Sequence, residues 1–397
     1  MATFFLLLIY LTFISLGLPD PLLGAAWPVM RTDLGAGLEA AGVISMIICA
    51  GTIVSSLASE RMTARFGTGT VTAVSVLATA AALLGFGLTP SYWWLLALAV
   101  PLGLGAGAVD VALNNFVALH YQARHMSWLH SFWGVGAFAG PMIMAVWLQA
   151  EGGWRGGYLT IGTIQLAVSL LLLATLGLWK RYGGASGRIL LSRESVRKDV
   201  PKLPPLRIPG VMFALLVFLL YCAVEYSAGL WSSSYLVEMR GFSKTWAARG
   251  TAGFYAGITV GRFLNGFLAS RYPGRLLIRC GALVVLGGAV LIALPLSGTV
   301  AFTGLILVGL GCAPIFPCMI HETPRRFGGV NSPSVIGLQM AMAYSGSMLF
   351  PPLLGVAAGR FGLGIFPFAL LFLGLLMLVF SEAITLAVNR DKAARSN

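Results

Sequence analysis

Charged residues are scarce in this chain of 397 residues. Only 10% are Asp, Glu, Lys or Arg, against about 25% in an ordinary soluble domain, and 58% are hydrophobic. Acidic residues are the rarest charges, with 13 Asp and Glu against 26 Lys and Arg. This composition excludes an ordinary soluble domain and predicts a protein built mainly from membrane-spanning segments.

The sequence also lacks the motifs of familiar catalytic sites. It contains no P-loop, no H-E-x-x-H and no G-x-S-x-G pattern. Its five cysteines lie in apolar runs without the spacing of metal ligands. We therefore expect a protein that is not an enzyme and that has no metal site and no cofactor. Nothing in these patterns predicts ATP hydrolysis.

The apolar runs are continuous rather than alternating, which predicts membrane-spanning helices and not barrel strands. The first run lacks the basic start and the cleavage site of a signal peptide, so we interpret it as a transmembrane helix. The fold class expected is all-α integral membrane, with twelve transmembrane helices. They are predicted at residues 3–27, 40–59, 69–88, 93–120, 128–149, 157–179, 208–235, 246–270, 276–296, 301–321, 332–357 and 362–388.

The basic residues indicate the topology. If the N-terminus is cytoplasmic, 20 of the 26 Lys and Arg lie on or near the cytoplasmic side, which predicts that both termini are inside. The net charge of +13 thus arises from basic residues in the loops between apolar runs, and no nucleic-acid partner is expected. The one long polar segment, 180–207, is predicted to be a cytoplasmic linker between six-helix halves at 1–179 and 208–397.

An internal repeat supports two pseudo-symmetric halves. Gly103-Leu104-Gly105 recurs as Gly309-Leu310-Gly311 at an offset of 206 residues, and Arg65 maps onto Arg271 at the same offset. Gly140-Pro141 has a counterpart in Phe350-Pro351 within a few residues of that shift. The repeat predicts two parallel six-helix halves with a cavity between them at mid-membrane depth.

Three carboxylates interrupt the apolar runs. Asp110 is the single formal charge among the 58 residues between Arg65 and Arg124, and Asp20 and Glu225 lie in two other runs. A charge inside a bilayer costs several kcal/mol unless it faces a polar cavity, finds a partner or takes up a proton. Asp110, Asp20 and Glu225 are therefore candidates for proton coupling, Asp110 first. Asp20, between Pro19 and Pro21, is alternatively a solvated carboxylate at the outer interface.

Polar side chains near these carboxylates predict a solute-binding wall. Asn114 lies one helical turn after Asp110 and shares its face, with Asn115 beside it, although an interhelical hydrogen bond that only stabilises the bundle is the alternative. Glu225 is followed by hydroxyl and aromatic side chains that include Trp231, which is either a sugar-binding platform or an interface aromatic. His130, Gln339 and Tyr344 are further candidates for solute binding, with packing as the alternative for His130.

Together these features resemble the major facilitator superfamily across essentially the whole chain. The loop Glu60–Gly67 is similar to that superfamily's G-x-x-x-D-R-x-G signature, with Glu60 in place of Gly and Ala64 in place of Asp. The second copy keeps Gly266 and Arg271. The resemblance implies a gating role for Arg65, Gly67, Gly266 and Arg271, and the missing acid leaves that role open in the first half.

Two stretches, Gly103–Asn115 and Tyr221–Tyr235, resemble the fucose–galactose–glucose–proton symporter branch of this superfamily. The resemblance implies proton-coupled symport of a sugar or similar polar small solute by alternating access. H+ is expected as coupling ion, with Na+ as the alternative. Gly136-x-x-x-Gly140-Pro141 partly resembles the signature of drug–proton antiporters, so proton-coupled export is the alternative function. We expect a monomer in a bacterial inner membrane, surrounded by lipid.

Overall fold

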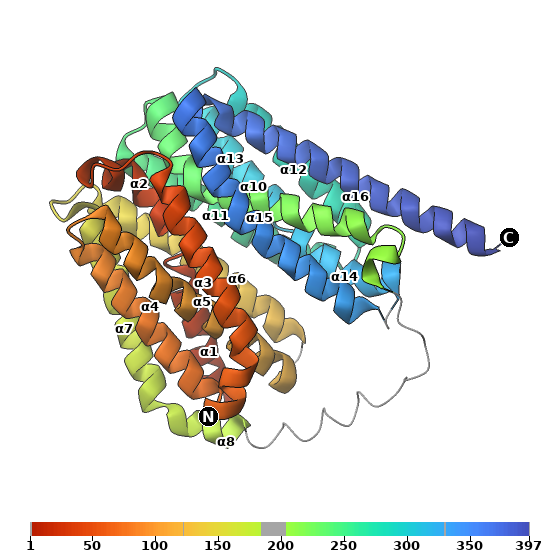
Figure 1. Ribbon diagram of the computed structural model, residues 1–397, viewed down its shortest axis with the longest axis horizontal. Helices are drawn as coiled ribbons and strands as arrows, with labels where there is room; N and C mark the ends of the chain where they lie inside the picture. The colour runs from red at the N-terminus through yellow and green to blue at the C-terminus, as the bar shows by residue number, and fades with distance from the viewer. Residues whose placement is uncertain (1, 122, 184–203, 329–330, 397) are drawn as a thin grey trace. The chain divides into compact units, whose positions relative to one another are not determined.

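The computed structural model describes residues 2–121, 123–183, 204–328 and 331–396, and these residues form helices joined by short connections (Figure 1). In chain order the helices are α1 (Ala2–Gly17), α2 (Leu22–Asp33), α3 (Ala40–Phe66), α4 (Thr68–Leu88), α5 (Tyr92–His120), α6 (Ala123–Trp147), α7 (Gly153–Ala174), α8 (Leu176–Gly183), η1 (Pro205–Arg207), α10 (Val211–Arg240), α11 (Lys244–Leu268), α12 (Gly274–Ala293), α13 (Gly298–Cys312), α14 (Ile315–Phe327), α15 (Ser332–Phe361), η2 (Leu363–Ile365) and α16 (Phe366–Ser396).

The predicted fold class is confirmed. Each predicted span overlaps one helix or one pair of consecutive helices, and eleven such stretches are long and apolar enough to cross a membrane. The predicted span at 246–270 corresponds to α11, which is not among the eleven. Lys244, Arg249 and Arg262 lower its hydropathy. Helices suit this environment because each satisfies its own backbone hydrogen bonds where no water is available.

Proline residues divide two of the predicted spans into pairs of helices. The first breaks at the turn Leu18–Pro21 between α1 and α2, which contains Pro19 and Pro21. The tenth is divided between α13 and α14 at Ala313 and Pro314. A proline ring removes a backbone donor and clashes with the preceding turn, so a continuous helix is disfavoured at these points.

The chain divides into two compact units. One contains residues 1–198 together with 243–252, and the other contains 199–242 and 253–397. Residues 243–252, which include the start of α11, therefore group with the first unit, although the sequence places them in the second half. The predicted linker at 180–207 lies largely outside the described residues, since only its two ends belong to α8 and η1.

In the first unit, α5 packs closely against α3. Thr52, Ser56 and Ser59 on α3 donate their hydroxyl hydrogens to backbone carbonyls of α5 at 3.3, 3.4 and 3.2 Å. The acceptors are the carbonyls of Gly103, Gly107 and Ala108. Small residues at such an interface let helix backbones approach, which is how helices associate in lipid.

The repeated Gly-Leu-Gly motif makes the same type of contact in each unit. A methyl group added at Gly103 would overlap the Ile48 carbonyl of α3, and one added at Gly309 would overlap the Phe254 carbonyl of α11. The third residue of each motif faces the preceding helix in the same way, Gly105 toward α4 and Gly311 toward α12. The two motifs therefore serve the same purpose, close packing of one helix against two neighbours.

A second pair of equivalent contacts joins the first and fifth spans of each unit. Gly136 of α6 lies against the Ile14 carbonyl of α1, and Gly346 of α15 lies against the Leu219 carbonyl of α10. Gly136 and Gly346 are separated by the same number of residues as Pro141 and Pro351, so both pairs belong to one repeat. Gly140 packs against the Leu18 carbonyl, in the turn that follows α1. The Gly-Pro segment of α6 is thus a packing element in this structure.

Candidate functional site

Asp110 lies in the second half of α5 and is half-buried. The side-chain amide of Asn114 donates to Asp110 Oδ1 at 2.9 Å and to the Asp110 backbone carbonyl at 2.9 Å. Within the described residues this carboxamide is the one hydrogen-bonding or ionic partner of the carboxylate. Asp110 and Asn114 thus share a face as predicted, whereas Asn115 is exposed.

Asp20 lies in the turn between α1 and α2, and its side chain is exposed. The indole of Trp133 on α6 donates to Asp20 Oδ2 at 2.8 Å. This contact connects the break in the first span to the fifth. The sequence places Asp20 between two prolines but gives no sign of its aromatic partner.

Glu225 is 7% exposed on α10, and Arg262 of α11 is its ionic partner. The closest atoms, Arg262 Nη2 and Glu225 Oε1, are 3.7 Å apart. The sequence alone does not identify Arg262 as the counter-ion of Glu225. A buried arginine needs such a counter-ion, since an isolated charge in an apolar interior is very costly.

Trp231 and Tyr235 further along α10 are buried. The Trp231 indole donates to the Pro351 carbonyl at 2.9 Å, and the Tyr235 hydroxyl donates to the Ile292 carbonyl at 2.8 Å. Trp231 has no exposed surface. In this structure both aromatic side chains pack inside the second unit, and their polar groups are already occupied by backbone carbonyls.

The three further candidates lie on α6 and α15. Gln339 on α15 is fully buried and accepts a hydrogen bond from the Thr323 hydroxyl of α14 at 3.1 Å. Tyr344, also on α15, is half-buried. His130 on α6 is half-buried, and its ring meets that of Phe13 edge to face at 6.1 Å.

The loop residues with a predicted gating role are exposed. Gly67 joins α3 to α4 with a φ of +80°, a conformation that favours glycine, and the Arg65 guanidinium lies 5.3 Å from the Phe66 ring centre. Gly266 faces open space near the end of α11, and Arg271 follows in the next turn. Shortly after Arg271 the chain forms a cluster of ion pairs, in which Arg275 and Arg279 both pair with Glu382.

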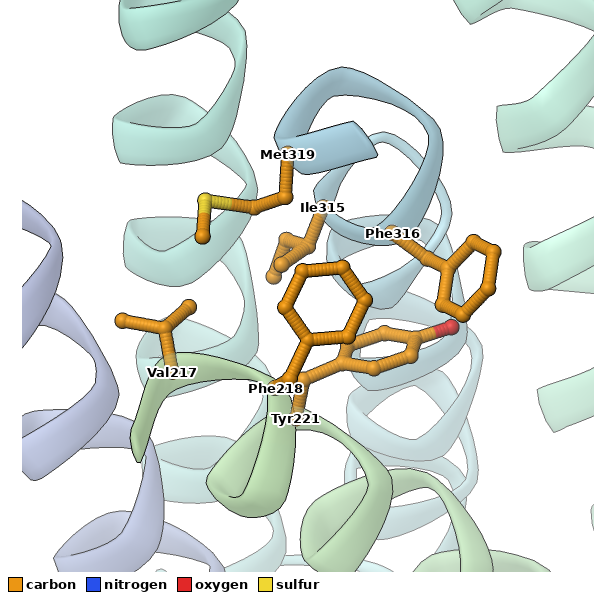
Figure 2. Close-up of a pocket in the computed structure, with 6 residues that line it drawn as sticks. All are labelled: Val217, Phe218, Tyr221, Ile315, Phe316 and Met319. Atoms are coloured by element: carbon orange, nitrogen blue, oxygen red, sulfur yellow. The ribbon is translucent and has the colours of Figure 1, made fainter. Parts of the chain in front are cut away.

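Two clusters of side chains, one closely packed and one beside a groove, include none of the candidate residues. Figure 2 shows six side chains of α10 and α14 that pack closely and leave no space for a solute, with the Tyr221 hydroxyl at the edge of the cluster. In the first unit a groove of about 690 Å³ lies along α7 and is bordered by Trp147, Arg155 and Thr160. The residues predicted to bind solute lie in neither.

Comparison with known proteins decides the family. The model of the Major Facilitator Superfamily matches residues 3–351, most of the chain. The chain belongs to the major facilitator superfamily. It is therefore a multi-pass membrane transport protein and not an enzyme, as the sequence predicts.

Several curated proteins are similar to more than half of this chain at about a quarter identity. Bypass of stop codon protein 6 of Saccharomyces cerevisiae is 24% identical over 89% of this chain and 77% of its own length. The glucose/mannose transporter GlcP of Bacillus subtilis is 24% identical over 58% of each chain. A chloramphenicol resistance protein of Streptomyces lividans is 25% identical over 69% of this chain and 68% of its own.

Solved structures show the same fold. A mutant of the nucleoside transporter NupG superposes with a TM-score of 0.74 at 11% identity and covers 96% of this chain and 98% of its own. A bacterial homologue of the human lysosomal transporter Spinster gives 0.72 at 16% identity, with 98% of this chain and 95% of its own covered. At these identities the likeness concerns the fold of the superfamily alone.

Proposed function

We propose that this superfamily member is a secondary active transporter that carries a sugar or similar polar small solute together with a proton, by alternating access. The observation that carries the proposal is the contrast between two carboxylates. Glu225 has a cationic partner in Arg262, whereas Asp110 has only the Asn114 carboxamide among the described residues. A half-buried carboxylate without a neighbouring cation is the one whose charge is most readily neutralised by a proton.

Asp110 then acts as the proton carrier. Proton loading removes the charge that opposes movement of the occluded carrier, and release on the inner side resets the cycle. The similarity to a glucose/mannose transporter supports a sugar as solute, together with the resemblance of the stretches around Asp110 and Glu225 to sugar–proton symporters.

The substitution Asp110→Asn tests this assignment. Asn copies the protonated side chain, so the variant is expected to bind solute and to exchange it across vesicles but to lose accumulation driven by a pH gradient. Asp33→Asn is the matched control, because Asp33 is a carboxylate of the same unit that is already paired with Arg155 at 3.4 Å. If Asp110→Asn still concentrates solute with the gradient, the coupling residue lies elsewhere. Accumulation driven by Na+ without a pH gradient would instead identify Na+ as coupling ion.

Proton-coupled export is the second candidate, and the similarity to a chloramphenicol resistance protein favours it. A thermal-shift screen of the purified protein against sugars, polyols and chloramphenicol at two pH values separates the two. Stabilisation by a sugar or polyol supports import, and stabilisation by chloramphenicol alone supports export.

We place the protein in a bacterial inner membrane as a monomer, with both termini and the 180–207 segment in the cytoplasm. In a cysteine-free background, needed because Cys280 is exposed, a single cysteine in that segment is expected to escape an impermeant maleimide in intact cells. If intact cells are labelled, the segment lies outside the cytoplasm and the proposed orientation is wrong. Light scattering of the purified protein measures its molar mass and so tests whether it is a monomer.

A further inference from the structure

The groove along α7 lies on a part of the first unit that crosses the membrane. α7 is one of the stretches long and apolar enough to span a bilayer, and the groove follows it from Arg155 to Ile164. This length is about 14 Å at the helical rise, close to half of the roughly 30 Å hydrocarbon core of a bilayer. Leu88 and Ile164 in its mostly apolar lining are exposed. The groove therefore extends along a single leaflet, with a surface suited to lipid chains.

Three glycines shape this groove. A methyl group added at Gly152 or Gly156 would overlap the ring of Trp147, and one added at Gly87 would overlap the side chain of Leu159. The ring of Trp147 therefore lies directly on the backbone at the start of α7. The hollow is built into the packing of α4, α6 and α7, and only a side chain at an exposed position can fill it without disturbing that packing.

Arg155 places a positive charge at the end of the groove where α7 begins. It is the one charged residue among the described residues that border the groove, and its side chain is 39% exposed. Nη1 lies 3.4 Å from Asp33 Oδ2 and Nη2 lies 3.3 Å from the Thr89 carbonyl oxygen, both beyond the about 2.7–3.2 Å typical of such hydrogen bonds. A guanidinium carries more N–H donors than these two contacts use, so Arg155 keeps donors for a further acceptor.

The surroundings of Arg155 indicate what that acceptor is. Trp147 ends α6, and the Arg155 guanidinium lies 4.3 Å from the ring centre of Trp154. Tryptophans gather at the interface between membrane and water, which places Arg155 at the level of the lipid headgroups. A guanidinium matches the geometry of a phosphate, whose oxygens accept its hydrogen bonds. Asp33 Oδ2 already accepts a shorter hydrogen bond of 2.7 Å from the Trp154 indole, so a phosphate competes only for the longer contact.

We infer that this groove binds a phospholipid, with its phosphate at the Arg155 guanidinium and one acyl chain along α7 toward Ile164. Under the proposed orientation the turn between α6 and α7 faces outward, so the lipid belongs to the outer leaflet. None of the residues proposed to bind solute or to carry a proton borders the groove. The site is therefore independent of the proposed function, and either can be wrong without the other.

Native mass spectrometry of the purified full-length protein, freed of lipid in detergent, measures the Kd of the first bound lipid. The probes are dipalmitoyl phosphatidylglycerol and dipalmitoylglycerol, which carry the same acyl chains with and without a phosphate. Arg155→Met is expected to raise the Kd of the phosphatidylglycerol about three- to tenfold and to leave that of dipalmitoylglycerol unchanged. Arg360→Met is the matched control, because it removes an exposed arginine at the end of α15.

A second variant fills the groove. Thr163 is exposed on α7, and its hydroxyl donates to the Leu159 carbonyl of the same helix at 2.8 Å. Thr163→Phe thus places a ring in the groove without removing a contact between helices, and it should raise the Kd of both lipids by a similar factor of about three or more. Thr303→Phe on α13 is the matched control, since this exposed threonine likewise donates to its own helix, at the Thr299 carbonyl.

The inference fails if Arg155→Met binds phosphatidylglycerol as tightly as Arg360→Met does. It also fails if Arg155→Met weakens both lipids equally, because the phosphate is then not bound at Arg155. If Thr163→Phe binds both lipids as tightly as Thr303→Phe does, the groove is not the lipid site. Thr163→Phe leaves the contacts of Arg155 in place, so it decides the question even if Arg155→Met does not fold.

Discussion

Replacement of Gly103 by alanine tests how closely the helices of the first unit pack. The added methyl group would overlap the backbone carbonyl oxygen of Ile48 and lie 2.9 Å from its carbonyl carbon. These are backbone atoms of α3, so no change of rotamer relieves the overlap, and α3 and α5 must move apart. Overpacking of this kind typically costs about 1–3 kcal/mol.

The hydroxyl contacts of α3 add to this cost. Thr52, Ser56 and Ser59 donate to α5 at 3.2–3.4 Å, already long for hydrogen bonds, so a separation of a few tenths of an ångström weakens all three. Loss of even one removes about 0.5–1.5 kcal/mol. Gly103→Ala is therefore expected to lose about 2–4 kcal/mol of stability. Gly309→Ala, in which the methyl group would overlap the Phe254 carbonyl, is expected to lose about 1–3 kcal/mol through overpacking alone.

Thermal unfolding in one detergent, monitored by intrinsic fluorescence, measures this difference. Gly287→Ala is the matched control, since Gly287 lies inside α12 and a methyl group there meets open space. Alanine favours a helix over glycine by about 1 kcal/mol, so this variant should unfold at the wild-type temperature or above it. The reasoning fails if Gly103→Ala and Gly309→Ala are as stable as Gly287→Ala.

Two further substitutions test other parts of the structure. Arg240 at the end of α10 donates to the Ile292 and Leu294 carbonyls at the C-terminus of α12. Arg240→Met removes these hydrogen bonds and is expected to lower the free energy of unfolding by about 1.5–3 kcal/mol, and with it the unfolding temperature. An unchanged unfolding temperature would show that the contact contributes nothing. Asn114→Ala and Asn115→Ala are each expected to weaken solute binding several-fold, by about 0.5–1.5 kcal/mol, as measured by calorimetry, and normal affinity in both would remove this wall from the site.

Much of this protein follows from its sequence because the bilayer leaves few alternatives. A chain with long continuous apolar runs must satisfy its backbone inside each segment, so helices and their approximate positions are determined before any tertiary contact forms. The proline pair around Asp20 likewise predicts the break between α1 and α2, since a proline disrupts its own helix. The shared face of Asp110 and Asn114 depends only on helical periodicity and was predicted correctly.

Partners from distant parts of the chain depend on tertiary structure. Arg262 pairs with Glu225, the Trp133 indole donates to the Asp20 carboxylate, and the Trp231 indole donates to the Pro351 carbonyl. Each of these contacts joins segments that are far apart in the chain, and periodicity within one helix does not reveal which distant side chain will face it. The glycine pattern shows which helices can approach closely, but only packing decides which backbone they meet. The sequence thus determines where the carboxylates lie along their helices, and the fold decides which of them has a cation beside it.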